Sequence, residues 1–193
     1  MTNDMLDLAP AAQRIAALAD AVRDDQLAGP TPCPDHAVRN LLGHLLGLSV
    51  AFRDAARKNL GDTTNTNPQS AVPDIDDGWR ATLPVVLDEL AAAWREPAAW
   101  EGMTQAGGLT LPAAQAGVVA LNELVIHGWD LARATAQPYQ PAPADLEVSR
   151  AMLSAFADRP AGSPFGQPFP VPADAPLLDR VIGLSGRSPS WRP

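Results

Sequence analysis

The sequence predicts an all-α protein: a bundle of four main helices with a longer crossover connection, an extra short helix and a proline-rich C-terminal extension. Apolar residues recur at helical spacing along several long segments, and proline, glycine and polar turn formers separate these segments. No segment has the alternating apolar and polar residues that are typical of a half-buried strand. We therefore expect helices packed around one core, with no strands.

The length of 193 residues is suited to one domain that buries a substantial core. Hydrophobic residues make up 46% of the chain, as in globular proteins that dissolve in water. We expect residues 1–158 to form the helical bundle and residues 159–193 to form a proline-rich extension that packs on it.

The first two helices are predicted on either side of a proline-rich turn. Residues 7–27 carry apolar side chains at helical spacing, with Pro10 near the start, and residues 29–34 (GPTPCP) end this helix. The Asp35 carboxylate can accept hydrogen bonds from backbone N–H groups at the start of a second helix. We place that second helix at about residues 35–59.

The middle of the chain is predicted to hold a third helix between two long connections. Residues 61–74 read as a polar loop, and the helix follows from residue 76 or 77 to about residue 95, with Pro84 as a point for a kink. Residues 96–112 then cross to the next helix. This connection is too long for a tight turn between neighbouring helices.

The last part of the chain is predicted to contain the longest apolar helix and a shorter one after it. The fourth helix spans about residues 111–136, with Pro112 in its first turn, and the fifth spans about residues 143–158. A proline-rich stretch follows. Residues 179–191 (DRVIGLSGRSPSW) are expected to add one helical turn that packs back on the bundle.

The charge and composition exclude several classes of protein. The formal net charge is −8, and no basic stripe is present to neutralise phosphates, so we expect no nucleic-acid partner. Polar residues such as Asn122 and Glu123 interrupt the longest apolar run, and the first residues lack the pattern of a signal peptide. We therefore expect no membrane partner and a cytoplasmic location. The single cysteine, Cys33, rules out an internal disulfide and a multi-cysteine zinc site.

One face of the predicted fourth helix combines small residues with ionisable ones. Its members recur every three or four residues and therefore lie on one side of a helix: Ala113, Ala116, Ala120, Glu123, His127, Asp130 and Ala134. A buried, ionised carboxylate is costly unless a cation or a strong donor compensates it. Either His127 pairs with Glu123, or both side chains face a metal ion.

The predicted second helix carries a histidine in the middle of an apolar stripe, formed by Ala37, Leu41, His44, Leu48, Ala51 and Ala55. His44 should therefore also point into the bundle, where it can meet Glu123 and His127. Two imidazoles and one carboxylate leave a coordination position open, as in catalytic zinc sites. Nickel, iron and manganese accept the same ligand types. The alternative is that the three are ordinary core residues and a helix ion pair.

Three other residues lie near this predicted site in the sequence or in the expected bundle. His36 precedes His44 by eight residues, about 12 Å along a helix, so we expect it outside the site. Asp130 can hydrogen-bond to an imidazole and orient it, or it can pair with Arg133 or a backbone donor. No histidine is spaced from Cys33 in the sequence in a way that indicates a shared site, and we expect Cys33 to be structural.

Two stretches resemble a known family: residues 31–47 (TPCPDHAVRNLLGHLLG) and residues 122–135 (NELVIHGWDLARAT). They resemble the DinB-like metal-binding bundles, in the branch named for the amino-terminal domain of mycothiol-dependent maleylpyruvate isomerase. Residues 179–191 resemble the C-terminal segment of a short actinobacterial subgroup. The resemblance implies that His44, Glu123 and His127 are the ligands of a divalent metal, zinc in the isomerase.

The resemblance also implies a function, in which the open metal position activates the thiol of a small cofactor, typically mycothiol, for addition or transfer to an electrophile. It implies a homodimer as a possible assembly. The isomerase has a larger second domain that completes its active site, whereas only about 35 residues follow the fifth helix here, which argues against maleylpyruvate as substrate. The alternatives are a metal- or ligand-binding bundle without turnover, with a role in a stress response, and a metal-free bundle.

Overall fold

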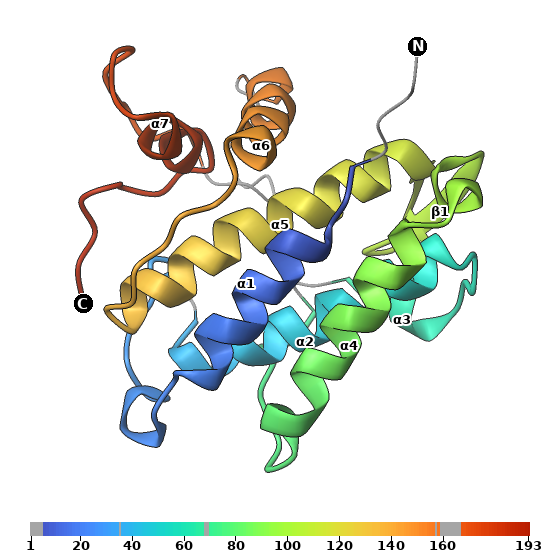
Figure 1. Ribbon diagram of the computed structural model, residues 1–193, viewed down its shortest axis with the longest axis horizontal. Coiled ribbons are helices and arrows are strands. Elements are labelled where there is room, and N and C mark those ends of the chain that lie inside the picture. Colours follow the sequence, from blue (N-terminus) through green and yellow to red (C-terminus); the bar gives the residue numbers. More distant parts are fainter. Residues whose placement is uncertain (1–5, 35, 68–69, 157, 159–166) are drawn as a thin grey trace.

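The computed structural model describes residues 6–34, 36–67, 70–156, 158 and 167–193, and within them the protein is mostly helical, as the sequence predicts (Figure 1). The helices are α1 (Ala9–Asp20), α2 (Val38–Ala56), α3 (Asp62–Asn65), α4 (Trp79–Trp94), α5 (Ala113–Ala134), α6 (Pro143–Ala155) and α7 (Leu177–Leu184).

The four longer helices α1, α2, α4 and α5 form the body of the protein. Both α4 and α5 pack against α1 and against α2, so each helix of this set has two neighbours in it. The helices α6 and α7 lie outside this body: α6 packs against α5, and α7 packs against α6 (Figure 1). The helix α5 is therefore covered on both sides, which explains its nearly continuous apolar sequence.

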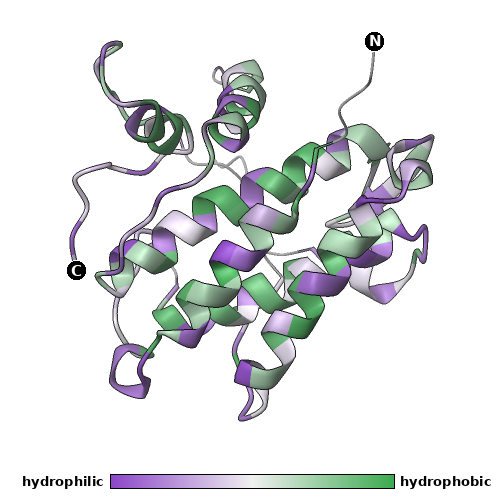
Figure 2. Cartoon of the chain, in the orientation of Figure 1, coloured by the Kyte–Doolittle hydropathy of each residue, from purple (hydrophilic) through white to green (hydrophobic). Residues whose placement is uncertain are grey.

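The core lies between these helices, where their apolar faces meet (Figure 2). Trp94 and Trp129 are among its largest buried side chains, and the Trp94 indole N–H donates a hydrogen bond to the Phe52 carbonyl at 3.1 Å. At Gly117 of α5, a Cβ atom would come within 2.5 Å of the Trp100 ring. The absence of a side chain at Gly117 therefore lets the tryptophans pack against α5.

The expectation of no strands was wrong within residues 96–112. A 3₁₀ turn (Pro97–Trp100) opens this segment, and the strands β1 (Met103–Ala106) and β2 (Leu109–Pro112) then form an antiparallel hairpin. Gly107 and Gly108 join the strands with φ angles of +58° and +80°. Two consecutive glycines favour this turn, because both of its central residues need a positive φ.

The helix α2 begins later than predicted, at Val38 rather than at about residue 35. Its first turn is held by the Asn40 side chain, whose Oδ1 accepts a hydrogen bond from the Ala37 N–H at 3.1 Å. Asp35, the predicted capping residue, lies outside the described residues. The described residues just before Val38 (29–34, 36 and 37) are not helical, and this changes where His36 lies.

Three other segments differ from their predictions in extent. The first helix ends at Asp20, and a short 3₁₀ helix (Asp24–Gln26) follows it instead of a continuous helix to residue 27. The predicted loop 61–74 contains α3. In the C-terminal tail, α7 has eight residues and is longer than the single turn expected. These are differences at ends and connections, where short-range patterns are least specific.

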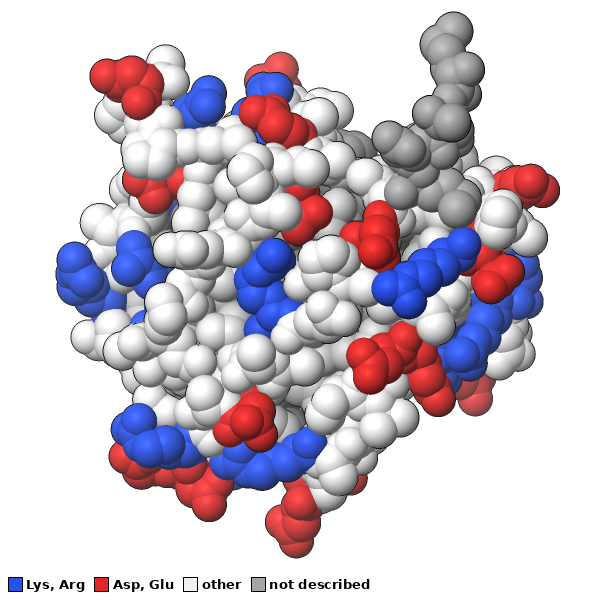
Figure 3. Space-filling view, in the orientation of Figure 1, with Lys and Arg blue, Asp and Glu red and all other residues white. Residues whose placement is uncertain are grey.

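Acidic and basic side chains are interspersed over the face of the molecule in Figure 3. Among the residues that the structure describes, no helix combines the length and the apolar character needed to cross a membrane.

Candidate metal centre

Three side chains from α2 and α5 converge inside the bundle: His44, Glu123 and His127. One potential ligand atom from each lies within 4.8 Å of the other two. The Glu123 Oε2 atom is 3.1 Å from His127 Nε2 and 3.6 Å from His44 Nε2, so the carboxylate lies between the two imidazoles. The rings meet edge to face, with centroids 4.7 Å apart.

The cluster is largely shielded from water, but it is not closed. The exposed fraction of the side chain is 17% for His44, 18% for Glu123 and 9% for His127. Burial alone would raise the pKa of Glu123, but hydrogen bonds to the two imidazoles hold it well below its usual range. Burial alone would lower the pKa of His127, yet its bonds to Asp130 and Glu123 raise it to about 9. Without a metal, His127 therefore carries a proton at neutral pH.

Asp130 holds the His127 ring from the other side. Its Oδ2 atom is 2.9 Å from His127 Nδ1, which leaves Nε2 directed at Glu123. Asp130 is completely buried, and burial by itself would raise its pKa. The charge of Arg187 and the hydrogen bond with His127 outweigh burial and lower that pKa, so Asp130 is ionised. The predicted contact between Asp130 and an imidazole is present in the structure.

The cation that compensates Asp130 is Arg187, which the sequence did not identify. Its Nε donates to Asp130 Oδ1 at 2.7 Å, and its Nη2 donates to Oδ2 at 2.8 Å, a two-point contact. Arg133, the partner considered from the sequence, instead donates to the Pro189 carbonyl at 2.9 Å. The sequence indicates only that a buried Asp130 needs a cationic partner. It does not identify the residue that supplies the cation.

His36 lies closer to the cluster than predicted. Its ring centroid is 5.7 Å from that of His44, whereas a continuous helix would have separated them by about 12 Å. The predicted separation was wrong because it extended α2 back through His36, although His36 is not a member of the three-residue cluster. The helix begins at Val38, and the residues before it follow a different course.

A histidine lies beside Cys33, which the spacing in the sequence did not indicate, and the structural role of Cys33 stays a prediction. The Cys33 sulfur is 3.5 Å from the Nδ1 atom of His36, which is three residues further along the chain. Cys33 is half-buried. The three-residue cluster therefore shares one region of the molecule with the loop residues Cys33 and His36 and the tail residue Arg187.

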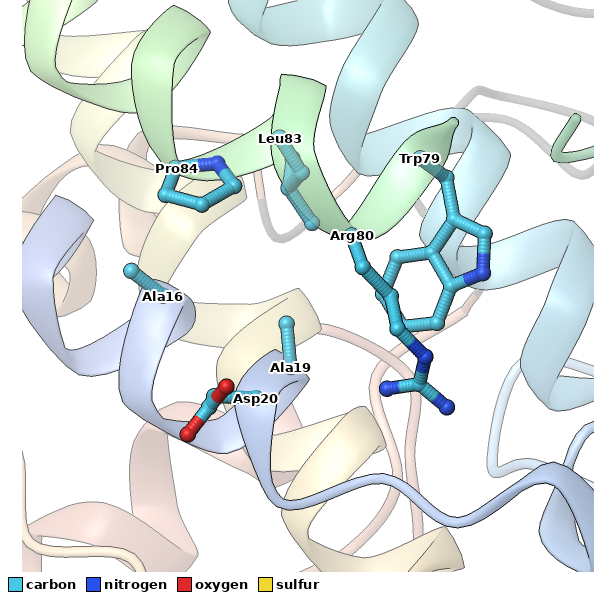
Figure 4. A pocket seen from close by; sticks show the side chains of 7 residues that line it. All are labelled: Ala16, Ala19, Asp20, Trp79, Arg80, Leu83 and Pro84. Carbon is cyan, nitrogen blue, oxygen red and sulfur yellow. The ribbon is translucent and has the colours of Figure 1, made fainter. Parts of the chain in front are cut away.

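Two hollows on the molecule lie apart from this cluster. One, of about 30 Å³, lies between α1 and α4, with Trp79, Arg80 and Leu83 on one side and Ala16 and Ala19 on the other (Figure 4). It is far smaller than a typical site for an organic ligand. A larger one, of about 310 Å³, lies between the end of α5 and residues 191–193. Neither hollow includes a member of the three-residue cluster.

The donor set fits a divalent metal. Two imidazole nitrogens and one carboxylate oxygen are the protein ligands of many catalytic zinc sites, and nickel, iron and manganese accept them too. The Asp130 contact to the distal nitrogen of His127 is the arrangement that commonly orients a histidine ligand. In the absence of a metal, the proton on His127 compensates the charge of Glu123.

Three kinds of comparison relate the chain to known proteins: a family model, relatives in sequence and solved structures of similar fold. Residues 8–132 match the family model described as the mycothiol maleylpyruvate isomerase N-terminal domain. Two uncharacterized proteins of Mycobacterium tuberculosis, Rv0738 and MT0763, are each 29% identical to the chain over 182 residues. These alignments cover 90% of this chain and 91% of each relative.

Two solved structures are similar in fold, and both are of mycothiol-dependent maleylpyruvate isomerase. One superposes with a TM-score of 0.65 at 16% identity, covering 95% of this chain and 88% of that one. The other, a histidine-to-alanine mutant, has a TM-score of 0.60 at 18% identity and covers 80% and 70%. Most of the solved chain thus has a counterpart here, which is more than we expected from the sequence. The family model matches well over half of the residues of this chain, and the chain therefore belongs to the mycothiol maleylpyruvate isomerase N-terminal domain family.

Proposed function

We propose that the protein is a divalent-metal-dependent transferase or isomerase that uses a low-molecular-weight thiol, with mycothiol as that thiol. The observation that carries the proposal is the convergence of His44, Glu123 and His127 in a largely buried cluster. Membership of the family and similarity in fold to a mycothiol-dependent isomerase support the choice of thiol. The electrophile is a second small molecule.

In this proposal His44, Glu123 and His127 hold the metal, zinc being our first choice, and Asp130 fixes the orientation of His127. A bound divalent metal would supply stabilisation of the thiolate, the nucleophilic form of a thiol, at neutral pH. The protein then needs no cysteine of its own for this step. The residues of the chain bind the metal, orient its ligands and restrict access of water.

The charges around the cluster are consistent with an anionic ligand at the open position. Glu123 and Asp130 are ionised and Arg187 is a cation, so with neutral imidazoles the group carries one net negative charge. A divalent metal changes this to one net positive charge. A buried excess charge is unfavourable, and a thiolate or hydroxide would remove it.

Metal content is the first test. Protein made without a histidine tag should contain about one divalent metal per chain, and His44→Ala should abolish retention, because Glu123 and His127 alone bind a metal weakly. A content near zero that remains low after reconstitution would favour the metal-free alternative, in which the proton on His127 balances Glu123. Unchanged metal retention in His44→Ala would show that the site lies elsewhere.

Thiol binding is the second test. Mycothiol added to the cobalt-substituted protein should produce a thiolate-to-cobalt charge-transfer band, because direct coordination of sulfur creates that transition. The band should be lost in Glu123→Ala and in His127→Ala, and it should persist in Cys33→Ala. If neither mycothiol nor another small thiol produces a band, a bundle that binds metal or a small ligand without turnover becomes the better description.

Maleylpyruvate is the first electrophile to assay. The sequence comparison argued against this substrate, because the isomerase has a larger second domain. The structural match covers 88% of one solved isomerase chain, which weakens that objection. Turnover of maleylpyruvate that requires both metal and mycothiol would identify the reaction, whereas a thiol band without turnover would call for other electrophiles.

A further inference from the structure

Cys33 and His36 form a second reactive group beside the candidate metal centre. The Cys33 sulfur is 3.5 Å from His36 Nδ1, and the His36 ring is 5.7 Å from the ring of His44. A thiol next to an imidazole is a recurrent arrangement for an activated nucleophile, because the imidazole can accept the thiol proton. The proposed metal site does not use either side chain.

The loop before α2 holds this pair in place. The Thr31 hydroxyl lies 2.9 Å from the Cys33 carbonyl oxygen and 2.7 Å from that of His36, and it accepts a hydrogen bond from the Cys33 N–H at 3.1 Å. One side chain thus fixes the backbone at both members. Cys33 is half-buried, so the residue is not sealed inside the core.

Arg187 links the pair to the cluster electrostatically. Burial lowers the pKa of Arg187, but Asp130 and, more weakly, Cys33 and Glu123 raise it above its ordinary value. Coulomb attraction is mutual, so the Arg187 guanidinium favours the thiolate of Cys33. Cys33 therefore has a base on one side and a cation within electrostatic reach.

We propose that Cys33 is a site of reversible S-thiolation, with His36 as its base. His36 Nδ1 takes the proton from Cys33, and the thiolate attacks one sulfur of a small-molecule disulfide. A new disulfide bond forms between Cys33 and that sulfur while the original disulfide bond breaks. The second sulfur leaves as a thiolate and takes the proton from His36, so the products are the mixed disulfide and one small thiol. Excess thiol reverses the step.

S-thiolation of Cys33 should also affect the metal centre, and this second effect rests on the proposed function. A group attached to Cys33 lies next to His36, which is itself next to the predicted ligand His44. It should obstruct the approach of a second thiol to the metal. The disulfide form of the cofactor would thereby reduce activity, and the thiol form would restore it.

The rate of S-thiolation tests the role of His36. The purified full chain is mixed with oxidised glutathione at neutral pH, and the glutathionyl adduct is followed by intact-protein mass spectrometry. Native wild type should react at least about tenfold faster than His36→Ala. His36→Gln, which retains a polar side chain but no base, should be as slow, and Cys33→Ser should form no adduct.

A matched control removes the effect of the fold. In urea the wild type and both His36 variants should react at equal rates, because their sulfur is then fully exposed in each. Equal rates of native wild type and a folded His36 variant would overturn the proposal. The proposal would also be overturned if the native wild type reacted no faster than the same protein in urea.

The effect on the metal centre is tested with the cobalt-substituted protein. After S-thiolation at Cys33, an added thiol should give a charge-transfer band at least about tenfold weaker, and a reductant should restore the band. A band of full intensity in the modified protein would overturn the blocking role. If unmodified protein gives no band, the proposed function has failed, whereas the rates of adduct formation still decide whether Cys33 and His36 form the reactive pair.

Discussion

Asp130 is completely buried and contacts two basic side chains, His127 one turn earlier in α5 and Arg187 in the C-terminal segment. The carboxylate thereby fixes the imidazole that we propose as a ligand, and its own charge is compensated. Such contacts to the distal nitrogen of a histidine ligand are often as important as the ligand's own geometry.

At this scale we predict that Asp130→Asn weakens metal binding about 10- to 100-fold, because the amide neither carries the charge nor sustains the basicity of His127. A competition titration against a chelator would measure the change. Asp54→Asn is the matched control, since Asp54 is also buried but pairs with Arg53, away from the cluster. An equal loss of affinity in both variants would mean that the effect is general.

Metal binding should depend on pH through His127. In the metal-free protein its pKa is raised to about 9, so below that pH the ring carries a proton that a metal must displace. We expect the affinity to rise about tenfold per pH unit between about pH 7 and 9, with release of about one proton, and to level off above pH 9. Calorimetric titrations in buffers of different ionisation enthalpy would count the proton. A flat affinity over this interval would contradict the prediction.

At the scale of elements, α2 contains two glycines one turn apart in different surroundings. A Cβ atom at Gly43 would lie 2.7 Å from backbone atoms of Asp74, whereas one at Gly47 would have no neighbour within 4 Å. Gly43 precedes the candidate ligand His44, so the close contact between α2 and the connection to α4 lies beside the cluster.

These glycines provide a matched pair of variants. Gly43→Ala should lower the free energy of unfolding by about 1–3 kcal/mol, because a backbone segment must move to make room. Gly47→Ala should raise it by about 0.5–1 kcal/mol, since alanine is the better helix former at an open position. Urea unfolding measures both. A stabilising effect of Gly43→Ala would show that the backbone around Asp74 moves at little cost.

At the scale of the whole molecule, the C-terminal segment after α7 returns to the C-terminal end of α5. Arg187 pairs with Asp130, and the Pro189 carbonyl accepts a hydrogen bond from Arg133. Two segments more than 50 residues apart in the sequence thus share a buried ion pair. The division of the chain into a bundle (1–158) and an extension (159–193) remains a prediction, and residues 159–166 lie outside the described residues.

Removal of one member of this pair should therefore affect the whole protein. Arg187→Ala leaves the buried Asp130 without its cation, and we expect the free energy of unfolding to fall by about 3–5 kcal/mol. Arg192→Ala, at an exposed position of the same tail, should change it by less than about 0.5 kcal/mol. Thermal and urea unfolding would compare the two. A loss in Arg187→Ala as small as the control's would show that water or another group compensates Asp130.

The sequence by itself determined the helices and the meeting of three side chains. Helical periodicity assigns each residue to a face, and the alternating steps of three and four placed Glu123 and His127 together and His44 on an inward stripe. The structure brings these three together. Their role as metal ligands stays a prediction.

Only the tertiary structure decided the rest. The position of His36 depended on where α2 begins. The contact of Cys33 with His36 depended on the path of the non-helical loop before α2. The pairing of Asp130 with Arg187 joins residues 57 apart in the sequence. Periodicity describes neighbours within one regular element, whereas such contacts depend on the path of loops and on how distant segments pack, and a local pattern does not encode either.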